Sequence, residues 1–474
     1  MRSKLWLLCL IFLVVCFTHC RSKVVTPYDS GYSIHLATSL LQEGDLDLDE
    51  YRELIPPNDY RVIEVDGHLY SRYPVGPSVL VAPFVDLVET FSKDVFRIPF
   101  ASIVQGQPAG VERLCGSLFV AATALVLFAI ARQRLSVGLS LLVVFIFAFC
   151  TSSWSVVSRA LWQHGPSMLF LSATLWVLLR AREEPRFAQY AGLFLAAAYT
   201  MRPTNALPVL LLTAYVALEH RAWLWRFLAW ASVVAVPFLG YNLATSGEIL
   251  PWYYRQPQNF DPLRWRFLEG LAGTLVSPGR GLFLYSSVLL FSLLGAVVLA
   301  RSGRWSRLDS FLVLWLVGHW LSISSFANWW GGTVFGPRLF ADLIPGLIYF
   351  LVPAVERLRT PGRARWGLAV GLGVTTLASF GIHRAGATDY GPWDWNIDRT
   401  HIDQDRARLW NWSDPPFLRR RSEHVIVPAA SPLPPEQRKA ERKRRREERR
   451  AKPPTQGDLR VSFSSPRFEE VAPL

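Results

Sequence analysis

Charged residues are scarce in this chain of 474 residues: they make up 18% of it, while hydrophobic residues make up 51%. An ordinary soluble domain carries about a quarter charged residues. A disordered protein is excluded, because a disordered chain has few hydrophobic residues. Cysteine is also rare, and all five cysteines lie in or beside apolar runs, which excludes a disulfide framework.

Acidic residues are too few to balance the basic ones, and the net charge is +13. The excess is uneven, since residues 438–452 alone hold ten Lys or Arg against three Glu. We interpret residues 431–474 as a charged, disordered tail that is attracted to anionic headgroups. This interpretation is favoured over nucleic-acid binding, because the topology below places the tail outside the cell.

Long apolar runs of about 16 to 22 residues, the length needed to cross a bilayer, recur along the chain. They predict an all-α polytopic membrane protein with about eleven transmembrane helices. The runs lie near residues 5–20, 111–131, 137–153, 166–181, 187–201, 204–219, 222–245, 281–300, 308–326, 338–356 and 364–382.

Arginine placement orients these spans. Five short connections together hold fourteen arginines, and basic short loops stay in the cytoplasm. We therefore expect these connections inside, and the segments 21–110, 246–280 and 327–337 outside. The five connections are 132–136, 180–187, 219–227, 301–307 and 356–366.

The predicted organisation begins with a signal-anchor helix over residues 1–20. That run also has the form of a cleavable secretory signal, but Thr18-His19-Cys20 lacks the small residue of a cleavage site. The other predicted parts are an outer loop (21–110), a transmembrane bundle (111–383), a short aromatic outer segment (384–430) and the basic tail. Within the outer loop, Tyr32–Leu41 and Gly76–Phe91 predict amphipathic helices that lie along the interface.

One acid follows the first span directly, namely Asp29. Its spacing to Tyr32, Ala37, Leu41 and Gly44, followed by Tyr73-Pro74, Pro77 and Glu112-Arg113-Leu114, resembles the first outer loop of the GT-C glycosyltransferases. The likeness is to the branch of protein mannosyltransferases and aminoarabinose transferases. It implies that Asp29 is the catalytic base, that the donor is a polyprenyl-phosphate-linked sugar, and that the site faces the periplasm from a bacterial inner membrane.

The chemistry of such a transfer can be stated from the residues as well. Inversion at the sugar needs a carboxylate to accept the proton of the attacking hydroxyl, and a departing lipid phosphate needs cations. Arginine binds phosphate with two parallel hydrogen bonds. Arg280 and Arg338 are flanked by Gly and Pro, and Arg202 precedes Pro203, so we expect these three arginines to hold the phosphate.

His164, Tyr32 and Trp330 are further candidates for contacts to the sugar or phosphate. These residues and the three arginines each have a simpler interpretation. Interfacial arginines extend toward headgroups, a histidine can cap a helix, and most interfacial Trp and Tyr form an aromatic belt. The alternating run Asp45, Asp47, Asp49 superficially resembles a metal-binding motif, and we interpret it as a solvated turn. Neither a metal nor a cofactor is expected.

Two alternatives to an enzyme remain. A transporter or flippase for lipid-linked sugars usually has charges at mid-membrane or repeated halves, whereas here no clear repeat is visible and the candidates gather at one surface. The second alternative is a non-catalytic assembly subunit of the cell envelope. It rests on Ser30, which stands where many relatives have a second acid. The acceptor, whether protein, lipid or glycan, is undefined by the sequence.

Overall fold

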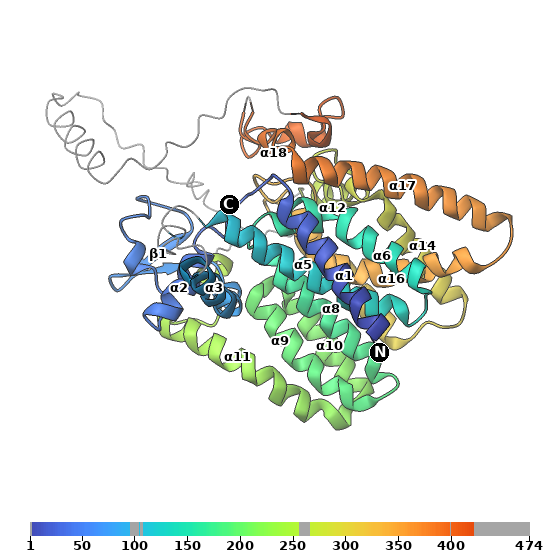
Figure 1. The fold of residues 1–474 in the computed structure, drawn as a ribbon, viewed down its shortest axis with the longest axis horizontal. Helices are drawn as coiled ribbons and strands as arrows, with labels where there is room; N and C mark the ends of the chain where they lie inside the picture. The colour runs from blue at the N-terminus through green and yellow to red at the C-terminus, as the bar shows by residue number, and fades with distance from the viewer. Residues whose placement is uncertain (1, 95–103, 105–107, 256–265, 399, 421–474) are drawn as a thin grey trace, which may run out of the picture. The chain divides into compact units, whose positions relative to one another are not determined.

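The structure is a computed structural model that describes residues 2–94, 104, 108–255, 266–398 and 400–420. All of these residues belong to one unit of the chain, Met1–Ser422. The basic tail predicted over residues 431–474 lies outside the described residues. The chain is mostly helical, as predicted, and residues far apart in the sequence lie side by side in its bundle (Figure 1).

Each of the eleven predicted runs coincides with a helix, because an apolar stretch satisfies its backbone polar groups most simply in that form. Four of these helices are long and apolar enough to cross a membrane, or five if the bent pair Val137–Phe149 and Ser152–Arg159 is one span. The count of eleven spans therefore stays a prediction. The helices are α1 (Arg2–Arg21), α5 (Ala109–Arg132), α6 (Val137–Phe149), α8 (His164–Ala181), α9 (Ala191–Met201), α10 (Ala206–Glu219), α11 (Leu224–Ser246), α14 (Leu290–Arg301), α15 (Arg307–Ser324), α16 (Ile344–Glu356) and α17 (Arg363–Thr388).

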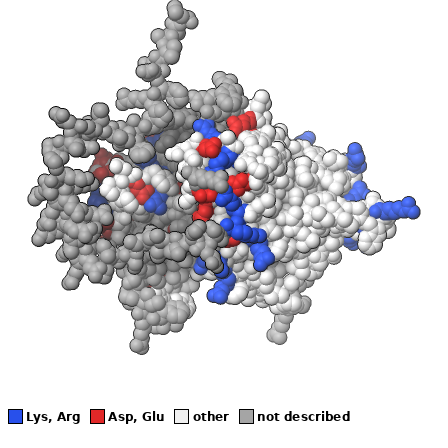
Figure 2. Space-filling model, turned by 90° about the horizontal axis from the view of Figure 1, so that it is seen from above, with Lys and Arg blue, Asp and Glu red and all other residues white. Residues whose placement is uncertain are grey.

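Close helix packing builds the bundle: α1 lies against α5, α5 against α8, α8 against α9, and α14 against α16. Gly295 of α14 makes the last approach possible, because a Cβ atom there would collide with the backbone carbonyl of Phe350. The described surface in the right half of Figure 2 is mostly free of charged side chains, and Lys or Arg side chains mark its far end. An uncharged surface of this kind suits a lipid environment.

The loop between α1 and α5 contains the two predicted interfacial helices, α2 (Ser33–Gln42) and α3 (Gly76–Asp94), which pack against each other. It also contains a two-stranded hairpin of β1 (Val62–Val65) and β2 (His68–Ser71). The expectation of an all-α chain was wrong at this point. The two-residue turn Asp66-Gly67 has positive φ at both positions, 52° and 89°, as this type of tight hairpin requires.

Short helices connect or cover the bundle at the same end as this loop (Figure 1). The segment after α17 packs its Trp395, Ile402 and Leu409 against Trp329 and Trp330. It therefore packs on the loop between α15 and α16, and its place as an outer segment stays a prediction. The short helices are α7 (Ser152–Ser155), α12 (Arg266–Val276), α13 (Leu282–Tyr285) and α18 (Gly391–Asp394).

Candidate active site

The chain leaves α1 along a path that a buried arginine holds in place. Arg159 is fully buried, and its guanidinium donates to the carbonyl oxygens of His19 (2.6 Å), Ser22 (3.3 Å) and Val24 (3.3 Å). The backbone N–H of Thr26 in turn donates to the carbonyl of Arg159. Arg159 thus holds the segment that leads to Asp29.

A second buried group fixes the residue after Asp29. The carboxylate of Glu112, on α5, accepts hydrogen bonds from the Ser30 hydroxyl and from the backbone N–H of Leu161. Ser30 and Glu112 are both almost fully buried. Glu112 therefore joins the segment that carries Asp29 to the turn that carries Leu161 and Trp162.

Asp29 itself lies against a cation and two phenols. Its Oδ2 accepts a hydrogen bond from Nη1 of Arg338 at 2.9 Å, and its Oδ1 accepts from the hydroxyls of Tyr73 at 3.0 Å and Tyr60 at 3.4 Å. Its side chain is 21% exposed and that of Arg338 is 12% exposed. The carboxylate is thus half-sheltered but still open to a ligand.

The two phenols keep their protons at neutral pH. Burial raises the pKa of Tyr73, and the negative charge of Asp29 raises it further. Desolvation and the charge of Asp29 raise the pKa of Tyr60 as well, although 55% of this residue is exposed. Both hydroxyls therefore act as hydrogen-bond donors to Asp29.

Arg338 follows Pro337 at the start of a 3-10 turn, Arg338–Leu343, that leads into α16. Its guanidinium lies over the ring of Trp162, 4.6 Å from the ring centroid, and such stacking suits a planar cation. Its Nε is buried and has no hydrogen-bond partner among the described residues. Arg338 thus has capacity for a further acceptor beyond Asp29.

Asp29 and Arg338 line one cavity of about 760 Å³. This volume falls within the range of small-molecule sites. The cavity lies at the end of the helices opposite the arginine-bearing connections, since α8 runs from His164 at the cavity to Ala181, and α9 ends beside Arg202. Other lining residues are Tyr28, Tyr60, Tyr73, Trp162, Gln163, His164, Arg202, Tyr253, Tyr254, Asn328, His401 and Asp403.

Arg202 and His164 lie at the cavity wall on a buried polar network. Both contact Oδ2 of Asp342, which is fully buried, and His164 does so at 3.1 Å through Nδ1. Ser167 donates to the other oxygen of Asp342 at 2.6 Å. The carboxylate of Asp342 therefore neutralises Arg202 from behind while Arg202 still lines the cavity.

Three of the predicted site residues lie outside the cavity lining. Arg280 is buried and donates to the carbonyls of Gly279, Trp330 and Gly332 and to the side chain of Asn396. These bonds give Arg280 a structural role, holding the loop before Arg338. Such internal bonding also explains the Gly and Pro around Arg280, which predicted a phosphate contact.

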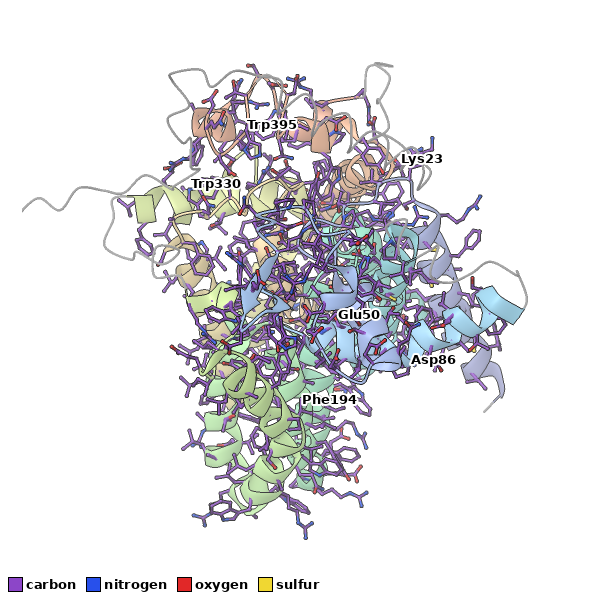
Figure 3. The ribbon with its side chains drawn as sticks, turned by 90° about the vertical axis from the view of Figure 1, so that its left-hand side faces the viewer. Lys23, Glu50, Asp86, Phe194, Trp330 and Trp395 are labelled. Atoms are coloured by element: carbon purple, nitrogen blue, oxygen red, sulfur yellow. The ribbon has the colours of Figure 1, made fainter. Side chains whose placement is uncertain are left out.

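Tyr32 and Trp330, the other two, are bonded to acids within the chain. The Tyr32 hydroxyl donates to Asp59 at 2.8 Å, and the Trp330 indole donates to Asp403 at 2.7 Å. Figure 3 shows Trp330 and Trp395 close together at one end of the molecule, away from Phe194 of α9. Trp330 thus supports Asp403, which does line the cavity.

Several lining residues were not singled out from the sequence. His401 and Asp403 come from the segment after α17, where His401 contacts the hydroxyl of Thr333 at 3.1 Å. Tyr60 comes from the loop between α1 and α5, as does Tyr73, which is part of the spacing noted after Asp29. Of the residues behind the lining, Asp342 carried a recognisable signal, because an acid within a predicted apolar span is costly unless it is paired.

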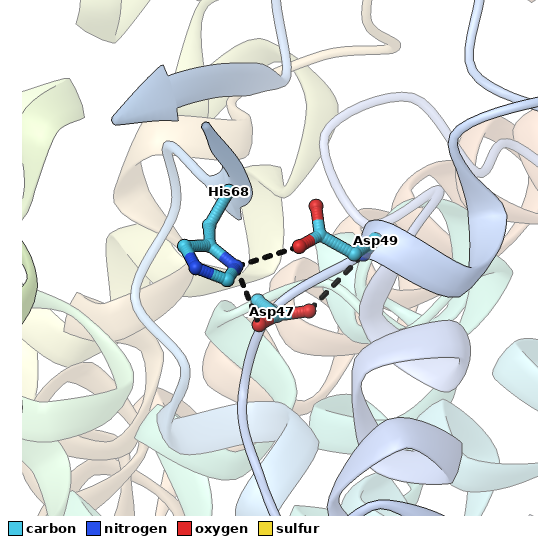
Figure 4. A group of neighbouring side chains, drawn as sticks. All are labelled: Asp47, Asp49 and His68. Atoms are coloured by element: carbon cyan, nitrogen blue, oxygen red, sulfur yellow. Dashed lines mark hydrogen bonds and ion pairs between the residues drawn. The ribbon is translucent and has the colours of Figure 1, made fainter. Parts of the chain in front are cut away.

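The acidic run near residue 47 lies beside His68, which is about twenty residues away in the sequence. Asp47, Asp49 and His68 place one ligand atom each within 4.8 Å of one another (Figure 4). The Asp49 carboxylate also accepts from the backbone N–H of Leu69 at 2.9 Å and from Arg52 at 3.0 Å. These bonds fasten the hairpin to the turn before it, as a structural cluster would.

Residues 97–241 match the model of the dolichyl-phosphate-mannose-protein mannosyltransferase family. The match confirms the resemblance to the GT-C glycosyltransferases and indicates a membrane glycosyltransferase of that type. It includes Glu112, His164 and Arg202, while Asp29 and Arg338 lie outside it. No curated protein and no solved structure matches the chain.

Proposed function

We propose that this chain, which resembles the mannosyltransferase family over residues 97–241, transfers a sugar from a polyprenyl-phosphate carrier to an acceptor hydroxyl or phosphate at the outer face of the membrane. One observation carries the proposal: Asp29 and Arg338, a base and a cation, meet at 2.9 Å on the wall of a cavity of about 760 Å³. A transfer away from a phosphate needs both groups within reach of one sugar.

Asp29 acts as the general base of this transfer. The acceptor oxygen forms a bond to the anomeric carbon of the sugar while its proton passes to the Asp29 carboxylate. The two tyrosines donate to Oδ1 and Arg338 donates to Oδ2, so Oδ2 receives the proton once Arg338 turns to the phosphate of the donor.

The leaving group takes the electron pair of the broken bond between the anomeric carbon and the phosphate oxygen. It departs as a lipid phosphate, which needs charge stabilisation rather than a proton donor. Arg338, with its unpartnered Nε, and Arg202, which lines the same cavity, supply that stabilisation. Donor binding then competes with Asp29 for Arg338 and frees the base.

The aromatic wall supplies the surface against which a sugar binds. Tyr253 and Tyr254 follow α11 and line the cavity, and Tyr253 lies 4.8 Å from Tyr73, measured between ring centroids. His164 contributes a polar ring beside Arg202. Apolar faces combined with a few fixed polar groups are typical of a small-molecule site.

The test is release of lipid phosphate from a panel of polyprenyl-phosphate sugars by purified protein. We expect Asp29→Asn to slow release by about 10²- to 10⁴-fold, the usual contribution of a general base. Donor binding, measured separately, should remain. The matched control is Asp86→Asn, since Asp86 is an exposed acid of α3 that does not line the cavity.

Two results would overturn the proposal. Equal turnover by Asp29→Asn and the wild type would remove Asp29 from the mechanism. Binding without turnover of every donor, together with movement of a lipid-linked sugar across vesicles that contain the protein, would favour a flippase instead.

A further inference from the structure

A second cavity, of about 400 Å³, lies at the opposite end of the bundle from the candidate active site. Three helices end there in the same direction, and each supplies part of the wall: α5 with Ile130, α8 with Leu179, and α16 with Tyr349, Val352 and Pro353. The wall is completed by Gln133, Arg134, Arg182 and Glu183, which belong to two of the arginine-bearing connections.

Two guanidinium groups face this cavity without an acidic partner. Nη1 of Arg134 is buried and has no hydrogen-bond partner among the described residues. Arg182, likewise, makes no side-chain hydrogen bond or ion pair within the described part of the chain. The one acid of the lining, Glu183, is paired with Arg180 at 3.2 Å.

The simplest structural role for arginines at helix C-termini is to donate to the last carbonyl groups. Arg132 donates its Nη1 to the carbonyl of Leu135, which lies in the connection after α5. Arg134, two residues later, lines the second cavity, and its buried Nη1 has no hydrogen-bond partner among the described residues. A buried donor without a partner is unfavourable, so a ligand that supplies an acceptor is favoured there.

The hydroxyl of Tyr349 is already used, because it donates to Oδ1 of Asp309 at 2.5 Å. The other oxygen of Asp309 accepts from the backbone and side chain of Ser306, at 2.7 and 2.6 Å. Asp309 is therefore committed to the start of α15 and does not compensate the arginines. The cavity keeps a cationic side and an apolar side formed by Ile130, Leu179 and Val352.

We propose that this second cavity binds the phosphodiester headgroup of an anionic phospholipid. The two guanidinium groups match a phosphate with charge-assisted hydrogen bonds, and the apolar side matches the start of the acyl chains. The position at the helix ends is where a headgroup of that leaflet lies, and basic pockets between transmembrane helices are suited to such lipids. A free phosphate ion would leave the apolar side in contact with water.

The test is native mass spectrometry and thermal unfolding of the full chain in detergent with added lipid. We expect dioleoyl phosphatidylglycerol to raise the unfolding midpoint and to be retained as a bound lipid, and dioleoyl phosphatidylcholine to do neither. The double variant R134Q/R182Q should lose at least fivefold in apparent affinity for phosphatidylglycerol.

A matched double variant, R226Q/R301Q, removes the same charge from two connections of the same group outside this cavity. It should keep the affinity of the wild type. Equal loss in both double variants would show a general attraction of cations to anionic lipid and would overturn the proposal. Stabilisation by inorganic phosphate alone, abolished by R134Q/R182Q, would assign the cavity to a soluble phosphate and overturn the lipid assignment.

Discussion

Arg338 pairs with Asp29 at 2.9 Å, although 309 residues separate them in the chain. The pair joins the segment that follows α1 to the turn that opens α16, and a glycosyl transfer needs both groups on one wall. Each residue was expected to act in such a site, but their contact depends on the packing of the helices between them.

The guanidinium group of Arg338 is expected to matter beyond its charge. Arg338→Gln removes a charge-assisted hydrogen bond worth about 1.5–3 kcal/mol, so kcat/KM for lipid phosphate release should fall about 10- to 100-fold. Arg338→Lys keeps the charge but loses the planar guanidinium and its stacking on Trp162. Its kcat/KM should therefore lie between the values of the wild type and of Arg338→Gln. Arg384→Gln, an exposed arginine of α17, is the control and should be unchanged. Wild-type kinetics in Arg338→Gln would contradict the phosphate role.

The pair of Arg202 and Asp342 offers a test by double mutation. Asp342→Asn leaves Arg202 charged and unpaired in a buried site, which should cost about 3–5 kcal/mol and lower the thermal unfolding midpoint. The double variant R202Q/D342N leaves no unpaired charge, so it should be more stable than Asp342→Asn alone. If Asp342→Asn unfolds at the same midpoint as the wild type, Arg202 does not need the charge of Asp342 for stability.

Gly295 sets the distance between α14 and α16. Gly295→Ala places a Cβ atom against the backbone carbonyl of Phe350, which cannot move without shifting α16. Overpacking of this kind costs about 1–3 kcal/mol, and we expect a lower unfolding midpoint and a smaller folded yield in detergent. Gly373→Ala in α17 is the matched control, because a Cβ atom there meets open space. Similar unfolding midpoints for the two variants would show that α14 and α16 are not packed closely at Gly295.

His35 of α2 predicts a pH dependence. Burial lowers the pKa of His35 to about 4, and the ring lies 4.8 Å from that of Tyr51, measured between centroids. Between pH 6.5 and 4 the unfolded chain binds more protons at this residue than the folded chain, so stability falls as the pH falls. The full effect is at most about 3 kcal/mol at 1.36 kcal/mol per pKa unit.

The measurement is the unfolding midpoint at pH 7 and pH 4.5 for the wild type and for His35→Phe. Phenylalanine fits the aromatic surroundings and does not titrate, so the variant should lose less stability on acidification than the wild type. A drop of the same size in both proteins would mean that other groups govern the acid response.

Helices of this fold could be predicted because an apolar run long enough to span a bilayer is a local property of the sequence. The hairpin β1–β2 was missed, although Asp66-Gly67 between alternating side chains is a local hairpin signal. The hairpin is only four residues per strand, and the apolar stripes of the two helices on either side of it are the stronger pattern in this loop.

The sequence predicted some of the residues that line the cavity, and their roles in a reaction stay predictions. Asp29, Arg338, Arg202 and His164 line the cavity, whereas Arg280 does not. Glycine and proline around an arginine permit close approach by a ligand or by the backbone itself, and the sequence does not distinguish these cases. His401 and Asp403 could not be predicted, because they reach the cavity only through the packing of Trp330 and Trp395.

The two ends of the described chain meet at this cavity: Tyr28 and Asp29 follow the first helix, and His401 and Asp403 follow α17. During synthesis residue 29 leaves the ribosome long before residue 403, so the cavity lacks one wall until the segment after α17 has been made. A partly made chain therefore holds Asp29 in an open trough, and the cavity lining is complete only when residue 403 has folded onto the bundle.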